Sequence, residues 1–388
     1  MAKKLQKGNG RLRGKVMEMV KRKQKTLKAA SLELGISYRQ AKRIYQRYLA
    51  GGDASLIHGN TGKPSNNKVD ETVLAKAIEL YRDKYYDFGP TLAQETLLER
   101  DGLNIKVSTL RRVLLSAELW RQKKNSSEYR SRRAPRARFG ELVQFDGSHH
   151  DWFEGRAARC CLITMIDDAK KVRISQFFDE ETMFGAMIVL KIWIERHGIP
   201  ESLYCDKKNA FVLTREPTDA EILAGNLKPK SHFGRACDLL GIEVIPANSP
   251  QAKGRVERNH GVDQDRLVKA LRLEGISNIE EANRFLLETY LPKMNEKFSR
   301  PARDKDDAHV TLGKVKLDDI LCMEFDRVIS KDFIIRFQAR LFQILKTNKP
   351  LPRTGDSVIV RIRLDNSIHI LWKDKSLQVK EIPTMFDD

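Results

Sequence analysis

The periodicity of apolar and polar residues changes along the chain. Apolar residues recur at helical intervals in residues 27–48 and 72–115. From about residue 140 they gather in short runs divided by turn formers, which is typical of strands, and helical patterns lie between several of these runs. We therefore expect a multidomain chain with an N-terminal all-α region, a central α/β region built on a mixed sheet, and a C-terminal small β-barrel.

Residues 1–55 are expected to form a helix-turn-helix domain. Gly35 follows a helical segment and can adopt the positive φ of a sharp turn, and Ser37 is a good N-cap for a second helix. With its apolar residues turned inward, the second helix exposes side chains suited to base edges and phosphates: Tyr38, Arg39, Gln40, Lys42, Arg43 and Arg47. The alternative is a basic helical hairpin whose charged face is only solvated.

A second helical DNA-binding domain is expected in residues 66–120. Helical spacing recurs there at 72–81, 91–98 and 108–115. Ser108 is placed as the N-cap of another recognition helix, with Arg111 and Arg112 as its DNA contacts. The same two arginines could equally belong to a solvated face.

Residues 121–138 are strongly basic and nearly devoid of apolar side chains, so they cannot bury enough surface to fold alone. We expect a linker that lies along a phosphate backbone, with Arg130, Arg132 and Arg133 among its DNA contacts. The whole chain has a net charge of +19 and a pI near 9.6. Double-stranded DNA is therefore the expected partner.

The central region is expected to span residues 139–292. Strands are predicted at 142–146, 160–166, 172–178, 202–205 and 243–245. Helices are predicted at 182–197, at 233–240, and after Pro250 as far as Leu273. Such an order describes a mixed sheet flanked by helices.

Beyond Pro292 we expect irregular, charged chain up to about Val315, followed by a domain in residues 315–388. Its predicted strands lie at 333–337, 340–345, 357–363 and 367–372, divided by Gly and Pro turns. Short strands at this spacing suggest the small β-barrel.

Composition excludes several classes of protein. No apolar run is long enough to span a bilayer and the N-terminus does not read as a signal peptide, so we expect a cytoplasmic protein without a membrane partner. Five cysteines are an odd number without Cys-x-x-Cys spacing, and we expect reduced, buried thiols rather than disulfides or a zinc site: Cys160, Cys161, Cys205, Cys237 and Cys322.

Three acidic residues are candidates for one metal site. Asp146 and Asp206 each end a predicted strand, and Glu257 lies inside the predicted helix after Pro250. Three carboxylates brought together by folding would form the all-oxygen ligand set that Mg²⁺ or Mn²⁺ prefers. Two ions held in this way suit phosphoryl transfer. Asp146, Asp206 and Glu257 are therefore the expected metal ligands and catalytic residues.

Cations near these acids could hold phosphates, or could form an ordinary solvated face: Lys207, Lys208, Lys253 and Arg255. His149 and His150 could shuttle a proton or touch DNA, but could also be strand residues on alternate faces. Asp167 and Asp168 compete as a second metal ligand. They fall in a tight turn, however, where Asp is favoured for backbone hydrogen bonding.

The three acids, the order of strands, and the segments Lys253-Gly-Arg-Val-Glu-Arg258 and Gln264-Asp-Arg-Leu267 resemble the DDE transposases of bacterial insertion sequences. These enzymes share the retroviral-integrase catalytic core, which has an RNase H-like fold. The resemblance implies that the three acids bind metal and that the helix-turn-helix region binds the terminal inverted repeats. It also implies that the C-terminal barrel is similar to those of transposases related to phage Mu.

Two details depart from this family pattern. Lys207-Lys208-Asn209 replaces the glycine-containing turn that often follows the second aspartate, and residues 213–230 look like an inserted loop.

We expect an enzyme that cleaves and joins DNA, acting as at least a dimer because two element ends must be handled together. The alternatives are a DNA-binding relative without catalysis and a metal-dependent nuclease without joining.

Overall fold

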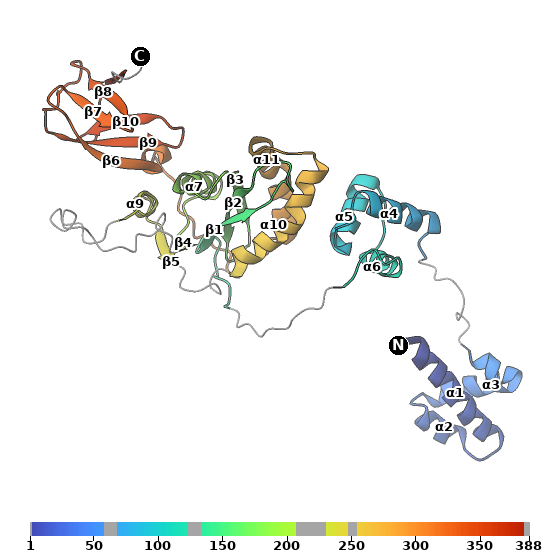
Figure 1. The fold of residues 1–388 in the computed structure, drawn as a ribbon. Helices are drawn as coiled ribbons and strands as arrows, with labels where there is room; N and C mark the ends of the chain where they lie inside the picture. The colour runs from blue at the N-terminus through green and yellow to red at the C-terminus, as the bar shows by residue number, and fades with distance from the viewer. Residues whose placement is uncertain (1, 58–67, 123–132, 207–229, 247–253, 384–388) are drawn as a thin grey trace. The chain divides into compact units, whose positions relative to one another are not determined.

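The computed structural model describes residues 2–57, 68–122, 133–206, 230–246 and 254–383, with side chains from residue 12 onward. The chain divides into two compact units, Met1–Asn125 and Ser126–Asp388. The first is drawn from blue to teal and the second from green to red (Figure 1). The finer division into five segments stays a prediction.

The first unit begins with a small all-α fold. Its elements are α1 (Ala2–Lys21), α2 (Leu27–Glu33), α3 (Tyr38–Gly51) and the 3₁₀ turn η1 (Gly52–Leu56). They share a core of Val16, Met17, Val20, Ala30, Ile44 and Leu56. We did not predict α1, because Gly8, Gly10 and Gly14 weaken its helical pattern. Contacts with α2, α3 and η1 outweigh that low propensity.

The turn between α2 and α3 confirms the prediction. Gly35 has φ of +61°, where glycine avoids the Cβ clash of other residues. The Ser37 hydroxyl caps α3 by accepting the amide N–H of Gln40 at 3.2 Å. Ala41 and Ile44 are buried, so the opposite face of α3 is turned to solvent.

The predicted helices of the second helical region are present as α4 (Glu71–Asp83), α5 (Pro90–Asp101) and α6 (Val107–Ser116). The assignment of Ser108 as N-cap was wrong. Lys106 occupies the N-cap position and makes no side-chain capping bond, so Ser108 lies inside the helix. Ile105 and Leu110 are fully buried on either side of the helix start. Burial, rather than a capping hydroxyl, sets the beginning of α6.

A mixed sheet forms the centre of the second unit. Its described strands are β1 (Val143–His150), β2 (Cys160–Asp167), β3 (Arg173–Phe178), β4 (Ser202–Cys205) and β5 (Glu243–Pro246), in the order β3-β2-β1-β4-β5. β1, β2 and β3 pair antiparallel, whereas β4 runs parallel to both β1 and β5. All the strands predicted for this region are found.

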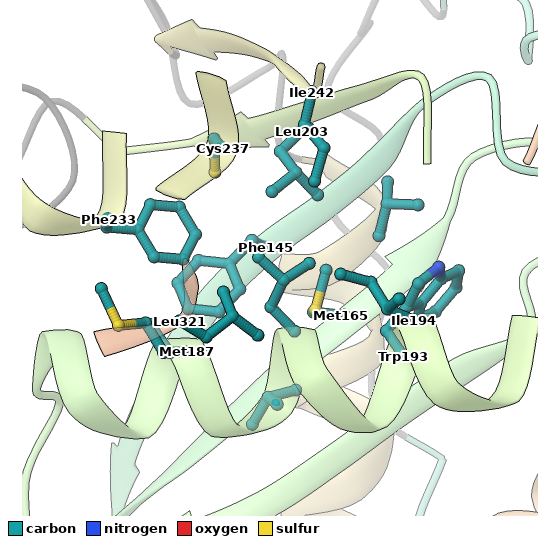
Figure 2. Close-up of a cluster of buried hydrophobic side chains, with 14 of the residues drawn as sticks. Phe145, Met165, Met187, Trp193, Ile194, Leu203, Phe233, Cys237, Ile242 and Leu321 are labelled. Carbon is teal, nitrogen blue, oxygen red and sulfur yellow. The ribbon is translucent and has the colours of Figure 1, made fainter. Parts of the chain in front are cut away.

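Helices cover both faces of the sheet. On one face lie α7 (Met183–His197) and α9 (His232–Leu239); on the other lie α10 (Gly254–Leu273), α11 (Ile279–Phe285), the π-helical turn η3 (Leu286–Tyr290) and α12 (Leu291–Phe298). Figure 2 shows the first face, where Phe145 and Leu203 of the sheet meet Phe233 of α9 and Trp193 of α7. The sheet is therefore a buried central layer.

The helix α12 corrects the expectation of irregular chain beyond Pro292. The proline is the second residue of α12, which continues directly from the π-helical turn η3. Asn295 of α12 accepts the amide N–H of Arg173 at 3.0 Å and donates to its carbonyl at 2.9 Å. Asn283 of α11 contacts Phe177 in the same way. These two side chains cover the edge of β3, which would otherwise be open for pairing.

The predicted closed β-barrel is not found in the described residues of the C-terminal region. After α13 (Leu317–Ile320), the strands form two separate sheets. One sheet contains β6 (Cys322–Val328), β9 (Ser357–Arg363), β10 (Ile368–Trp372) and β11 (Lys375–Ser376); the other contains β7 (Ile334–Phe337), β8 (Arg340–Ile344) and β12 (Val379–Ile382). They pack on a shared core to which Phe337, Phe342 and Val360 contribute. The predicted strands exist, but they pair within two layers instead of closing.

All five cysteines are buried and have free thiols, as expected. In the part of the chain that the structure describes, no helix has the length and apolar character needed to cross a membrane.

Candidate functional site

The first two candidate metal ligands lie on neighbouring parallel strands. Val143 of β1 pairs with Leu203 of β4, and Gln144 pairs with Tyr204. Continuing this register by two residues sets Asp206, which directly follows β4, beside Asp146. Neighbouring strands lie about 4.8 Å apart. The two acids therefore follow the last paired residues of adjacent strands by the same number of positions, and their role as metal ligands stays a prediction.

Residues at intervals of four on one side of α10 contact one face of β1. Gln144 Oε1 accepts the amide N–H of Val256 at 3.2 Å. Asp146 and Ser148 lie two and four positions after Gln144 on β1. They contact the next residues on this side of α10, His260 and Gln264. His260 Nδ1 lies 3.7 Å from Asp146 Oδ2, and Gln264 Nε2 donates to Ser148 Oγ at 3.2 Å. Two strand residues and four helix residues advance by similar distances, which keeps strand and helix in step.

Glu257 lies beside these contacting residues, directly after Val256 and three residues before His260. Its side chain is exposed, whereas Asp146 and Asp206 are half-buried. Among the described residues, no group of three or more His, Cys, Asp and Glu side chains is arranged to hold a metal ion. The structure thus places the two aspartates on or directly after adjacent strands and the helix of Glu257 against β1, but does not gather the three carboxylates.

A buried ion pair fixes the middle of α10 on the sheet. Arg173 of β3 and Asp263 of α10 are almost fully buried, with Nη2 of the arginine 3.0 Å from Oδ1 of the aspartate. The Tyr290 hydroxyl and the Asn259 amide also donate to Asp263, each at 2.8 Å. Burial raises the pKa of Asp263, and the Arg173 charge opposes that rise. This network of contacts holds α10 in a defined position.

The acids considered as rival ligands have structural partners. Asp167 accepts the backbone N–H groups of Gly140, at 3.1 Å, and of Lys170. Burial raises the pKa of Asp167 to about 6. Asp168 is fully buried and pairs with Arg133 and Arg255. The prediction that these acids serve backbone hydrogen bonding in a turn is confirmed for Asp167, and Asp168 additionally holds two arginines that we expected to contact DNA.

The remaining candidates around the acids divide into two groups. His149 and His150 are the last residues of β1; His149 is exposed and the His150 ring packs 5.3 Å from the Trp152 ring. Their placement as strand residues is confirmed. The cations Lys207, Lys208, Lys253, Arg130 and Arg132 lie outside the described residues.

The helix α3 presents its predicted DNA-binding side chains together on the surface. All six are exposed: Tyr38, Arg39, Gln40, Lys42, Arg43 and Arg47. The Lys42 ammonium lies 5.9 Å from the centre of the Tyr38 ring. On α6, Arg111 and Arg112 are exposed as well. These surfaces have the charge and exposure that contact with DNA requires.

Sequence reasoning missed the residues that join β1 to α10, chiefly Gln144 and His260. A signal for them was present. Gln144 lies between the apolar residues Val143 and Phe145 of β1, and His260 repeats the position of Val256 one helical turn later. Such polar positions on buried faces must find partners.

Comparison with known proteins gives consistent matches. A helix-turn-helix domain family matches residues 12–65. The Sinorhizobium fredii protein y4bF, which is named as a transposase, is 37% identical over 91% of this chain and 76% of its own length. The transposase for insertion sequence IS1202 of Streptococcus pneumoniae is 27% identical over 95% of this chain and 85% of its own. Among solved structures, the HTLV-2 integrase catalytic core domain in complex with magnesium has 18% identity and a TM-score of 0.29, covering 39% of this chain and 85% of its own.

A helix-turn-helix domain followed by a mixed α/β core thus occurs in a chain whose relatives are transposases. These features define the class as DNA-binding transposases. The chain belongs to the transposase family that includes y4bF of Sinorhizobium fredii.

Proposed function

We propose that this transposase cleaves the ends of an insertion sequence and joins them to target DNA in a metal-dependent reaction, with Asp146, Asp206 and Glu257 as metal ligands. The observation that carries the proposal is the parallel register of β1 and β4, together with the contact between α10 and β1. Asp146 lies on β1 and Asp206 directly follows the adjacent strand β4. Glu257 lies in the first turn of α10, the helix that packs against β1.

The donor set fits magnesium or manganese. All the side chains concerned are carboxylates, and such hard oxygen ligands favour Mg²⁺ and Mn²⁺ over softer metals. Two bound ions would activate the attacking hydroxyl and stabilise the leaving oxygen. Glu257 is exposed and can change rotamer, so its carboxylate can turn toward the two aspartates.

The exposed face of α3 supports recognition of the terminal inverted repeats. Its arginines and lysine suit phosphates, and Gln40 suits a base edge. The chain's net charge of +19 supports binding of both the element ends and the target DNA. Because two ends must be handled together, we propose that at least two copies of the chain assemble on DNA in the bacterial cytoplasm.

The test uses full-length protein, labelled end DNA, a target plasmid and Mg²⁺. The variants Asp146→Asn, Asp206→Asn and Glu257→Gln should each lower cleavage and joining by roughly 10²–10³-fold, since a catalytic metal contributes several kcal/mol. All three should still bind end DNA. Glu280→Gln on α11, where the side chain is 91% exposed, is the matched control and should act like wild type.

The products separate the proposal from its alternatives. Binding without cleavage indicates a DNA-binding relative, and cleavage without joining indicates a nuclease. Full joining by Asp146→Asn would remove Asp146 from the metal site.

A further inference from the structure

A buried carboxylate outside the proposed metal site connects several parts of the core. Asp168 follows β2, and its side chain is 0% exposed. Its Oδ1 lies 2.7 Å from Arg133 Nη2 and also contacts Arg255 Nε. The Gln144 amide donates to the same oxygen at 3.0 Å, and the Arg136 backbone N–H donates to Oδ2 at 2.7 Å. One carboxylate thus joins the start of the core, β1 and the first turn of α10.

Gln144 extends this connection by a second bond to α10. Its amide nitrogen donates to Asp168 while its Oε1 accepts the backbone N–H of Val256. Arg255 and Val256 directly precede Glu257, and Gln144 lies two residues before Asp146 on the same face of β1. The contacts of Asp168 therefore fix the backbone immediately beside two of the proposed metal ligands.

Stability alone gives a weak reason for a charge at this position. Burying a carboxylate is unfavourable unless it is fully paired, and well-packed apolar residues often stabilise a core as much as a buried ion pair does. A charged group with directional partners does, however, favour one arrangement over near alternatives. Here that arrangement is the position of the first turn of α10 relative to β1.

We propose that Asp168 is a positioning residue for the metal site. Through Arg255 and Gln144 it holds the first turn of α10 against β1, so that Glu257 is presented to ions shared with Asp146. This inference rests on the proposed function. It also gives Arg255 a role within the protein: its side chain is 21% exposed and its guanidinium is engaged by Asp168.

The test uses full-length Asp168→Asn and Arg255→Gln. Calorimetry measures binding of Mn²⁺ to the protein, and cleavage of labelled end DNA is followed as a function of Mg²⁺ concentration. Each variant should bind Mn²⁺ about tenfold more weakly and need about tenfold more Mg²⁺ for half-maximal cleavage, since residues that orient metal ligands typically have effects of this size. Affinity for end DNA should stay within about twofold of wild type, because the effect acts on metal binding.

The double variant Asp168→Asn/Arg255→Gln should be no worse than Asp168→Asn alone, because Arg255 acts through its contact with Asp168. Glu324→Gln is the matched control. Glu324 of β6 also holds two arginines, with Arg235 Nε at 3.3 Å and Arg361 Nε at 2.7 Å, and its side chain is 17% exposed. It should leave the Mn²⁺ affinity and the Mg²⁺ midpoint unchanged.

The possible results distinguish an error in the role of Asp168 from an error in the metal site itself. If wild type binds Mn²⁺ but both variants bind it equally well, the positioning role of Asp168 is wrong and the metal site stands. The same conclusion follows if the variants lose only thermal stability. If Asp168→Asn does not fold, the Mn²⁺ affinity of Arg255→Gln decides alone. If wild type binds no Mn²⁺ and cleaves no DNA, the metal site itself falls, and the role of Asp168 falls with it.

Discussion

Asp146 of β1 and His260 of α10 face each other, with Oδ2 of the carboxylate 3.7 Å from Nδ1 of the ring. The contacts of Gln144 with Val256 and of Ser148 with Gln264 lie on either side of this pair. A slip of α10 along β1 would break all of these contacts together. The strand and the helix therefore form one rigid support for the proposed site.

The recognition surface of α3 can be tested through the salt dependence of DNA binding. Affinity for end DNA should fall by orders of magnitude between ~50 and ~200 mM salt, because Lys and Arg release counterions from DNA. Arg43→Ala should weaken binding and reduce the slope of log affinity against log salt by about 1. Fluorescence anisotropy measures both quantities. Arg284→Ala on α11, where the arginine is 62% exposed, should leave the slope unchanged.

The cap of α3 predicts a local change in stability. Ser37→Ala removes the acceptor for the Gln40 amide and should lower the opening free energy of the first turn of α3 by about 1 kcal/mol. Hydrogen exchange of the α3 amides in the full-length protein measures this. Ser108→Ala is the control, since Ser108 makes no cap on α6. Equal decreases in the opening free energy of α3 and α6 would contradict the assignment of the caps.

The packing of α9 on the sheet predicts a larger effect. Phe233 is fully buried and its ring lies 6.1 Å from that of Phe145. Phe233→Ala should destabilise the core by about 3–5 kcal/mol, through lost burial and a residual cavity. Leu239→Ala on the same helix, at a residue 61% exposed, should change stability by less than about 0.5 kcal/mol. Urea unfolding followed by tryptophan fluorescence distinguishes the two variants.

The core should lose stability in acid because of His197. Burial lowers the pKa of this histidine to about 4, from 6.5 for the ordinary side chain, and the nearby His309 acts in the same direction. Between these values the unfolded chain binds the proton and the folded chain does not, so stability falls as pH drops from about 6.5 to about 4. His197→Gln should reduce this fall, measured as the urea midpoint against pH.

The raised pKa of Asp167 changes the pH dependence of folding stability in the opposite direction. Its folded form holds a proton up to about pH 6, so this group favours folding as pH drops. The difference between wild type and His197→Gln isolates the histidine from this background. An unchanged pH profile in the variant would show that His197 does not titrate in this range.

Local patterns predicted the core elements well, because short apolar runs and turn formers mark the strands from β1 to β5. They failed where pairing between distant segments decides the outcome. The C-terminal strands were located, but nothing local specifies whether they close into a barrel or form two sheets. Likewise β6, whose run Cys322–Val328 contains three charged residues, is a strand because it pairs with β9.

Prediction of the candidate site was limited in the same way, because contacts between distant segments cannot be seen in local patterns. The sequence singled out Asp146, Asp206 and Glu257, and the register of β1 and β4 agrees with the first two. The bond between Gln144 and Val256, however, joins residues 112 positions apart. No periodicity along the chain encodes such a pair. The residues that support a site therefore have to be found in the fold, even where its candidate ligands can be chosen from the sequence.

The division between Asn125 and Ser126 has a consequence for how this transposase can change. Each unit has its own buried core, so substitutions on the exposed face of α3 can change that surface without repacking the sheet that carries the acids. Under the proposed function, recognition of the element ends and the chemical step can then diverge at different rates. Under the proposed function, new surface residues in the first unit can match a new element end while the proposed metal site in the second unit is inherited unchanged.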